Sequence, residues 1–256
     1  MTGVDLNNLF RLDGKVVLVT GASSGLGDRF ARVLHAAGAQ VVVSARRLDR
    51  LEALVVDLPG SIAIQCDVSV ADQRVALIES TVAQCGTIDV LINNAGIGVV
   101  GPVETESLDT FENVLNVNTT AVWHLSKLAG AHMVAQRSGS IVNIASVLAH
   151  VGSTPIKQSN YCTSKAAVVG LTRELALQWS RKGVRVNALC PGWFPSELTE
   201  GMQTDESARA FIARECPLSR MGTLDELDGP LLVLASGAGG YITGQSIIVD
   251  GGWTAR

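Results

Sequence analysis

The chain alternates between two patterns of apolar residues. Short, nearly continuous apolar runs are typical of strands buried on both faces of a sheet, whereas apolar residues that return every three or four positions are typical of amphipathic helices. The first pattern predicts strands at residues 16–20, 40–44, 62–66, 90–93, 139–145, 185–189 and 246–249. The second predicts helices near residues 25–37, 48–57, 70–85, 108–137, 160–182 and 224–235.

Strands and helices that alternate in this way form βαβ units with right-handed crossovers. We therefore expect an α/β fold of the Rossmann type, a doubly wound parallel sheet of about seven strands flanked by helices. No repeat or linker divides the sequence, so residues 1–256 are interpreted as a single domain, with residues 1–13 as a loose lead-in. Residues 149–158 and 193–216 are irregular and are candidate functional loops, the second as a substrate loop.

Composition narrows the function classes. The 256 residues are 47% hydrophobic, but no apolar run approaches the ~18 residues that a membrane span needs. A net charge of −4 disfavours nucleic acid as the main partner. The five cysteines include no C-x-x-C pair, so neither a metal site nor a disulfide framework is expected. Residues 1–13 lack the basic start and apolar core typical of a signal peptide, so these features predict a cytoplasmic protein.

A glycine-rich turn follows the first predicted strand and opens the first predicted helix. The free N–H groups of a helix N-terminus attract phosphate, and glycines let the backbone approach it closely. A strand, a glycine turn and a helix in this order are typical of a dinucleotide site. The candidate contacts are Gly21, Ser23, Ser24, Gly25, Leu26 and Gly27.

A tyrosine and a lysine form a second candidate site. Tyr161 and Lys165 are four residues apart and share one face of a predicted helix. A free phenol has a pKa near 10, and a neighbouring ammonium favours the phenolate, so the pair suits proton transfer. Ser146 follows the fifth predicted strand, and the asparagine motifs of residues 93–96 and 116–119 lie between the glycine turn and this serine.

In this order, the motifs resemble those of the short-chain dehydrogenase/reductase family, and the resemblance runs from Lys15 to Asp-Gly-Gly at residues 250–252. It implies an oxidoreductase that moves a hydride between a nicotinamide cofactor and a small or apolar ketone or secondary alcohol, as a 3-oxoacyl reductase or related carbonyl reductase does. Tyr161 would be the general acid in reduction, and Ser146 would orient the carbonyl. Lys165 would lower the pKa of Tyr161 and bind the nicotinamide ribose, and Asn118 would anchor a water that relays protons.

The resemblance extends the cofactor site beyond the glycine turn. It implies that Asp67 binds the adenine amino group, with capping of the next helix as the alternative. Pro191 and Gly192 would lie against the nicotinamide, and Ser196 stands where the family often has a threonine that binds the carboxamide. The remaining expected cofactor contacts are Val68, Asn94, Ala95, Gly96, Tyr161 and Lys165.

The end of the second predicted strand bears on the choice of cofactor. Sites specific for NAD usually carry an acidic residue there, but this chain has Ala45 followed by Arg46, whose guanidinium suits a 2′-phosphate. The sequence therefore favours NADP(H), although Ser24 replaces a second basic residue that the family uses for this purpose. A solvated Arg46–Arg47 pair, an NAD(H)-dependent alcohol or polyol dehydrogenase and, more distantly, a non-catalytic nucleotide-binding regulatory protein are the alternatives.

The substrate region departs from the family's spacing. Ser146 and Tyr161 are 15 residues apart, a longer interval than in many family members, and the extra residues fall beside the expected pocket. A largely apolar lining would disfavour a highly charged sugar acid. His150 is expected either to contact the substrate or, as the alternative, to face solvent from its loop. The candidate substrate contacts are Leu148, His150, Trp193 and Phe194, with Val99, Val100 and Ile156 as further lining residues.

The helices around Trp123 and Trp179 carry more apolar surface than one sheet face needs. The resemblance implies that these helices pair with their copies in a homodimer, usually within a homotetramer. A monomer with buried tryptophans is the alternative.

Overall fold

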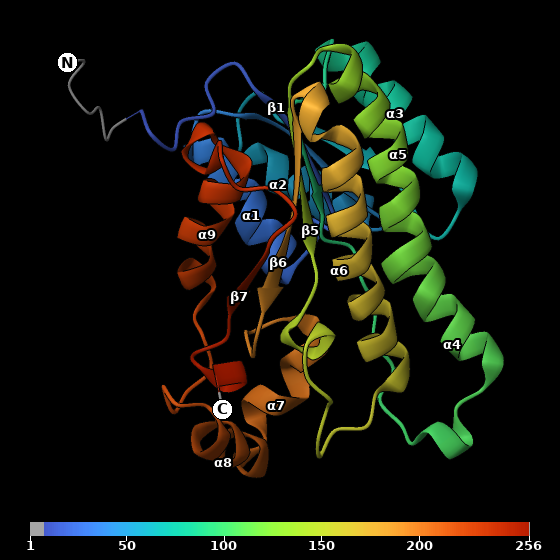
Figure 1. Cartoon of the computed structure of the whole chain (residues 1–256), viewed down its shortest axis with the longest axis vertical. Helices are drawn as coiled ribbons and strands as arrows, with labels where there is room; N and C mark the ends of the chain where they lie inside the picture. The colour runs from blue at the N-terminus through green and yellow to red at the C-terminus, as the bar shows by residue number, and fades with distance from the viewer. Residues whose placement is uncertain (1–7, 256) are drawn as a thin grey trace.

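The computed structural model describes residues 8–255, without the side chains of Gln203 and Thr204, so the first residues of the expected lead-in lie outside it. Figure 1 shows a sheet with helices on both of its faces. The strands are β1 (Val16–Thr20), β2 (Gln40–Ala45), β3 (Ile62–Gln65), β4 (Val90–Asn93), β5 (Gly139–Ile144), β6 (Val184–Pro191) and β7 (Ser246–Val249). All neighbours pair in parallel, in the order β3-β2-β1-β4-β5-β6-β7. The predicted doubly wound parallel sheet is confirmed.

Each face of the sheet has its own apolar core. The helices α1 (Gly25–Ala36), α2 (Leu48–Val56) and α9 (Asp228–Ala235) cover one face, where Phe30 and Leu51 are fully buried. The helices α3 (Ala71–Cys85), α5 (Ala121–Ala135) and α6 (Ser159–Trp179) cover the other, where Leu125 and Met133 are buried. The strands are therefore covered on both sides, which explains their continuous apolar runs.

The helix predicted at residues 108–137 is two helices joined by a wider turn. α4 (Leu108–Leu115) passes into a π-helical turn, Asn116–Thr120, before α5 begins. Turns of this kind interrupt α-helices frequently at functional sites. Periodicity did not reveal the turn, because apolar residues recur at helical spacing on both sides of it.

The segment predicted as an irregular substrate loop is largely helical. It contains the 3-10 turn η5 (Glu197–Thr199) and the helices α7 (Glu200–Thr204) and α8 (Glu206–Glu215). The Thr199 hydroxyl donates to the Phe194 carbonyl at 2.6 Å and accepts from the Ser196 N–H at 2.9 Å. These local bonds cap a turn that the polar composition of the segment concealed.

Short 3-10 turns complete the chain, at η1 (Val103–Thr105), η3 (Val147–Ala149), η4 (Ser180–Lys182), η6 (Leu224–Leu227), η7 (Gly237–Gly239) and η8 (Trp253–Ala255). The strand order reverses direction at β1, which lies between β2 and β4. Crossovers leave on opposite sides at such a point and open a crevice at the carboxyl ends of the strands. A cavity of about 760 Å³ lies there.

Candidate active site

A single cavity joins the glycine turn to the Tyr161–Lys165 pair. It runs from residues after β2 and β3, past the start of α1 and the end of β4, to α6 and the end of β6. All of the predicted cofactor contacts line it: Gly21, Ser23, Ser24, Gly25, Leu26, Gly27, Arg46, Asp67, Val68, Asn94, Ala95, Gly96, Tyr161, Lys165, Pro191, Gly192 and Ser196. The sequence thus placed these residues in one region although they come from distant parts of the chain.

The glycine turn brings the start of α1 close to the sheet. Gly21 and Gly25 have φ angles of +68° and +56°, which residues with a Cβ adopt only with strain. A Cβ on Gly27 would lie 2.2 Å from the Gly21 carbonyl oxygen. The helix begins without a side-chain cap at Ser24, so its first N–H groups are left for a ligand. This arrangement fits the pyrophosphate of a dinucleotide.

Asn94 and Asp67 hold the walls of the cofactor region. The Asn94 side-chain amide donates to the carbonyls of Thr20 and Gly21, at 2.9 and 3.1 Å, and so ties the glycine turn to the end of β4. The Asp67 carboxylate accepts from the Ser69 N–H at 2.9 Å. This bond closes a turn ahead of α3, which begins after Val70 without a side-chain cap, so Asp67 does not cap that helix; it does line the cavity.

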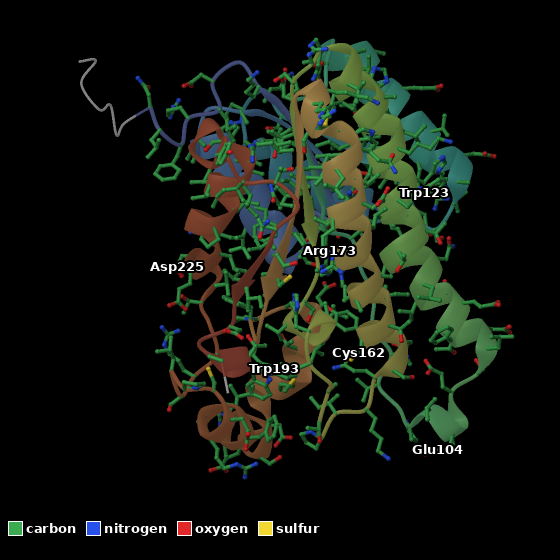
Figure 2. The ribbon with its side chains drawn as sticks, viewed as in Figure 1. Glu104, Trp123, Cys162, Arg173, Trp193 and Asp225 are labelled. Atoms are coloured by element: carbon green, nitrogen blue, oxygen red, sulfur yellow. The ribbon has the colours of Figure 1, made fainter. Side chains whose placement is uncertain are left out.

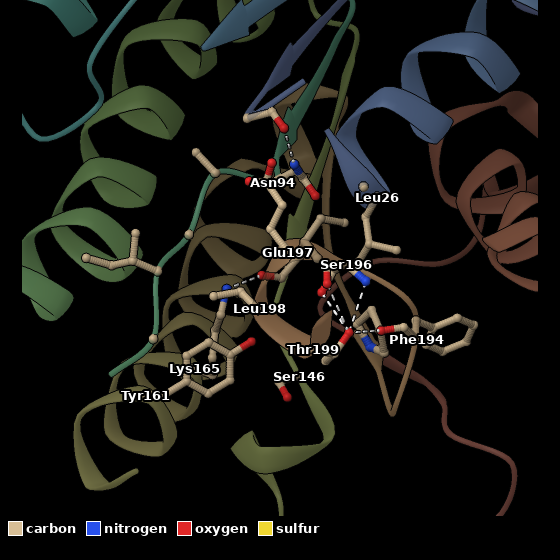
Figure 3. Close-up of a pocket in the computed structure, with 18 of the residues that line it drawn as sticks. Leu26, Asn94, Ser146, Tyr161, Lys165, Phe194, Ser196, Glu197, Leu198 and Thr199 are labelled. Atoms are coloured by element: carbon tan, nitrogen blue, oxygen red, sulfur yellow. Dashed lines mark hydrogen bonds between the residues drawn. The ribbon is translucent and has the colours of Figure 1, made fainter. Parts of the chain in front are cut away.

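A backbone carbonyl at the end of a strand holds the Lys165 side chain in place. Its ammonium donates to the Ile144 carbonyl, at the end of β5, at 2.7 Å, and lies 5.5 Å from the centre of the Tyr161 ring. The residue is only 3% exposed. Burial lowers the pKa of Lys165 to about 8. Figure 3 shows Tyr161, Lys165 and Ser146 together at one end of the pocket.

The pKa of Tyr161 differs from the expectation. Burial raises it to about 12, and a hydrogen bond with Ser146 opposes this shift only in part. The expected lowering is ascribed to Lys165 and an oxidised nicotinamide together, whereas among the groups of the chain the largest effect on the pKa is desolvation, which disfavours the charged phenolate. At neutral pH the phenol therefore keeps its proton, which a general acid needs.

Ser146 is held by the backbone that follows β5. It is the N-terminal cap of η3, and its hydroxyl accepts from the Leu148 N–H at 3.2 Å. The residue is 6% exposed and lines the cavity with Tyr161. The longer interval between Ser146 and Tyr161 therefore does not move the serine away from the site.

Asn118 lies under the same end of the cavity and is fully buried. Its side-chain amide accepts from the Ile97 N–H at 2.9 Å and donates to the Ile97 carbonyl at 2.7 Å. A Cβ on Gly96 would be 3.4 Å from both the Asn118 Oδ1 and the Lys165 Nζ, so these polar groups converge at that glycine. Asn118 thus shapes the loop after β4, and its role in a water relay stays a prediction.

The predicted substrate contacts separate into two groups. Leu148, Trp193 and Phe194 line the cavity. His150 does not, and its ring faces the Cys190 thiol at 3.6 Å. Of the additional apolar candidates, Val100 and Ile156 line the cavity and Val99 does not. The lining residues that the sequence left unassigned include Gln158, Met202, Ala208 and Phe211.

Two further positions escaped sequence reasoning. The Arg47 guanidinium donates to the Ser23 and Ser24 hydroxyls at 2.9 Å, so the second arginine of the pair lies against the glycine turn. Glu106 accepts from the Ser159 hydroxyl at 2.7 Å at the start of α6, just before Tyr161. The only signal for Arg47 was its place beside Arg46, and none pointed to Glu106.

The cysteines have no disulfide partners, and Cys66, Cys190 and Cys216 are buried. Burial raises the pKa of Cys66 and Cys190 to about 11, so these thiols stay protonated. Within residues 8–255, no group of three or more His, Cys, Asp and Glu side chains is placed to hold a metal ion. The helices of the same range are all too short or too polar to cross a bilayer.

Known proteins are similar to this chain over nearly its whole length. Residues 21–254 match the protein family described as enoyl-(acyl carrier protein) reductase. The 2-dehydro-3-deoxy-D-gluconate 5-dehydrogenase of Escherichia coli is 36% identical over 96% of this chain and 98% of its own length. A 3-oxoacyl-(acyl-carrier-protein) reductase of Thermotoga maritima is 37% identical over 94% of this chain and 98% of its own. The chain belongs to the short-chain dehydrogenase/reductase family.

A solved structure supports the same assignment. The crystal structure of a gluconate 5-dehydrogenase from Burkholderia cenocepacia, in complex with NADP and tartrate, is similar to this chain with a TM-score of 0.93 at 32% identity. The match covers 98% of this chain and 100% of that one. This short-chain dehydrogenase/reductase is therefore an oxidoreductase that acts on CH–OH and C=O groups.

Proposed function

We propose that this short-chain dehydrogenase/reductase uses NADP(H) to reduce a neutral, largely apolar ketone to its secondary alcohol, and catalyses the reverse oxidation. One observation carries the proposal: Ser146, Tyr161 and Lys165 meet at the end of a cavity whose other end is lined by arginines. The nicotinamide cofactor supplies or accepts the hydride when bound.

The residues at the catalytic end divide the remaining work. The Ser146 hydroxyl is positioned to hydrogen-bond the substrate oxygen and hold its carbon for hydride transfer. Tyr161 donates its proton to that oxygen in reduction and takes it back in oxidation. Lys165, fixed on the Ile144 carbonyl, has further N–H donors for the ribose and for the Tyr161 hydroxyl.

The choice of NADP(H) rests on charge. Ala45 ends β2 where an acid would bind a ribose 2′-hydroxyl, and Arg46 and Arg47 follow it on the cavity wall. Guanidinium groups bind phosphate strongly through paired hydrogen bonds. The similar gluconate 5-dehydrogenase from Burkholderia cenocepacia was crystallised with NADP.

The substrate class rests on what lines the remaining cavity. Among the described lining residues, the cationic side chains are Arg46, Arg47 and Lys165, of which the first two lie at the cofactor's adenosine end. A substrate carboxylate would therefore have no guanidinium partner near Ser146. Burying an unpaired carboxylate is costly, whereas an apolar substrate gains by burial. The names of the gluconate-type relatives favour a sugar acid as a second candidate.

A substrate panel tests these alternatives. The purified protein would be assayed with NADPH and with NADH on cyclic ketones, aliphatic ketones, β-keto esters and 5-ketogluconate. We expect the highest kcat/KM for neutral ketones with NADPH. Turnover confined to 5-ketogluconate would overturn the substrate class and support the second candidate.

We further propose that the protein is a homo-oligomer that pairs through α5 and α6. Trp179 packs inside the chain, because a Cβ on Gly130 would lie 2.6 Å from its ring. Trp123 and Leu177 instead remain 46% and 80% exposed, and Figure 2 shows Trp123 on the outer side of the molecule, away from α9. Light scattering would test this: we expect a dimer or tetramer, and Trp123→Arg should shift it toward the monomer.

A further inference from the structure

One carboxylate of the substrate segment reaches across to the cofactor side of the cavity. Glu197, the first residue of η5, accepts from Arg47 through both of its oxygens, at 2.8 and 3.1 Å. Arg50, in the first turn of α2, donates to the same carboxylate at 3.0 Å. Two guanidinium groups therefore bind a single carboxylate of the same chain.

The ion pair of Arg47 with Glu197 lies where we expect the 2′-phosphate of NADP(H) to bind. Arg47 binds the Ser23 and Ser24 hydroxyls of the glycine turn with the same guanidinium that holds Glu197. Arg47, Ser23, Ser24 and Glu197 all line the cavity. Two arginines with neighbouring hydroxyls form a binding site for a phosphate dianion, and Glu197 fills its paired donors.

We propose that Glu197 is a specificity-determining residue: its carboxylate competes with the cofactor's 2′-phosphate for Arg47 and so limits the preference for NADP(H) over NAD(H). The inference rests on the proposed use of NADP(H). The Arg47 and Glu197 side chains are 38% and 51% exposed, so water and salt screen their ion pair and a phosphate can displace it. A cofactor with a free 2′-hydroxyl makes no such demand on Arg47.

The test compares two ligands that differ only in the 2′-phosphate, adenosine 2′,5′-bisphosphate and AMP. Calorimetric titration would be carried out on the wild type, Glu197→Gln, Arg47→Ala and the double variant. We expect Glu197→Gln to bind the bisphosphate about fivefold more tightly and AMP unchanged, because an exposed ion pair is lost as a competitor. The gain should disappear when Arg47 is also replaced.

Glu200→Gln is the matched control. It removes a carboxylate three residues further along the same segment, and Glu200 takes part in none of the ion pairs found among the described side chains. Its affinity for both ligands should equal that of the wild type. An equal gain in Glu200→Gln would reveal general charge repulsion and overturn the role of Glu197.

The outcomes separate this inference from the proposed function. If the bisphosphate binds more tightly than AMP but Glu197→Gln does not strengthen it, Glu197 is no competitor and NADP(H) use stands. If the bisphosphate binds no more tightly than AMP in both the wild type and Glu197→Gln, the preference for NADP(H) fails, and this inference fails with it.

Discussion

The two ends of the cavity hold their polar groups in opposite ways. At the catalytic end, Ser146 and Lys165 are 6% and 3% exposed and are bound to the backbone. At the arginine end, formed by Arg46, Arg47, Arg50 and Glu197, the guanidinium groups of Arg47 and Arg50 bind the Glu197 carboxylate in water-exposed ion pairs. Buried groups have pKa values set by desolvation and geometries set by the fold, whereas exposed ion pairs are screened and exchange partners. The first end therefore suits chemistry, and the second suits selectivity.

The largest effect is expected at the catalytic end, from Tyr161→Phe. The variant should lose about 10²-fold or more in kcat, because it removes the hydroxyl that the proposed function assigns to proton transfer, while its affinity for NADPH stays near that of the wild type. Steady-state kinetics with fluorescence titration of NADPH would measure both. Tyr241→Phe is the control, since Tyr241 is fully exposed on the surface. A Tyr161→Phe variant with wild-type turnover would contradict the mechanism.

The buried ammonium predicts a pH-dependent stability. Lys165 has a pKa of about 8 in the folded protein against 10.5 in the unfolded chain, so between these values the unfolded chain binds more protons and stability rises with pH. The variant Lys165→Met has no ammonium and therefore does not incur the free-energy cost of burying one. The stabilisation of the variant over the wild type should shrink by about 2 kcal/mol between pH 7 and 9.5.

Urea unfolding at the two pH values would measure this difference. Tyr161, Cys66 and Cys190 are present in both proteins, so their titration contributes equally and cancels in this difference. Lys182→Met is the control, because Lys182 lies at the surface and should show no such trend. A pH-independent difference between Lys165→Met and the wild type would mean that the ammonium is not desolvated.

At the arginine end the expected effects are smaller and selective. Arg46→Ala should weaken NADPH binding several-fold and leave NADH binding unchanged, since an exposed guanidinium–phosphate pair is worth only ~1–2 kcal/mol. Ala45→Asp should repel the phosphate and favour NADH. Titration with both cofactors would decide, with Arg181→Ala, in the turn η4 that follows α6, as a control. Tighter binding of NADH than NADPH by the wild type would contradict the assignment.

The subtlest effect is expected in the segment of residues 193–216 that joins the two ends. We predict that it acts as a lid: hydrogen exchange across residues 193–210 should be fast in the free protein and slow when NADP⁺ and a product-like inhibitor bind. The alternative is a set of surface helices that stay in place. Strong protection already in the free protein would support that alternative.

The sequence alone predicted the fold, which the structure confirms, and a candidate catalytic group, whose role stays a prediction. Its continuous apolar runs predicted the strands, because strands buried on both faces have no polar side to display. The glycine turn and the Tyr161–Lys165 spacing predicted the two parts of the site. Both are local features, because a tight turn and a shared helix face depend on residues that are close in the sequence. The cofactor contacts predicted from the glycine turn, and those that the family resemblance implies, all line the cavity.

Only the tertiary structure decided which distant groups meet. Glu197 and Arg47 are 150 residues apart in the sequence, and no local sequence pattern predicted their ion pair. The π-helical turn at Asn116–Thr120 and the raised pKa of Tyr161 likewise depend on what packs around them. Long-range contacts and desolvation arise when the completed sheet brings separate segments together. The periodicity and spacing of residues along the chain therefore do not predict them.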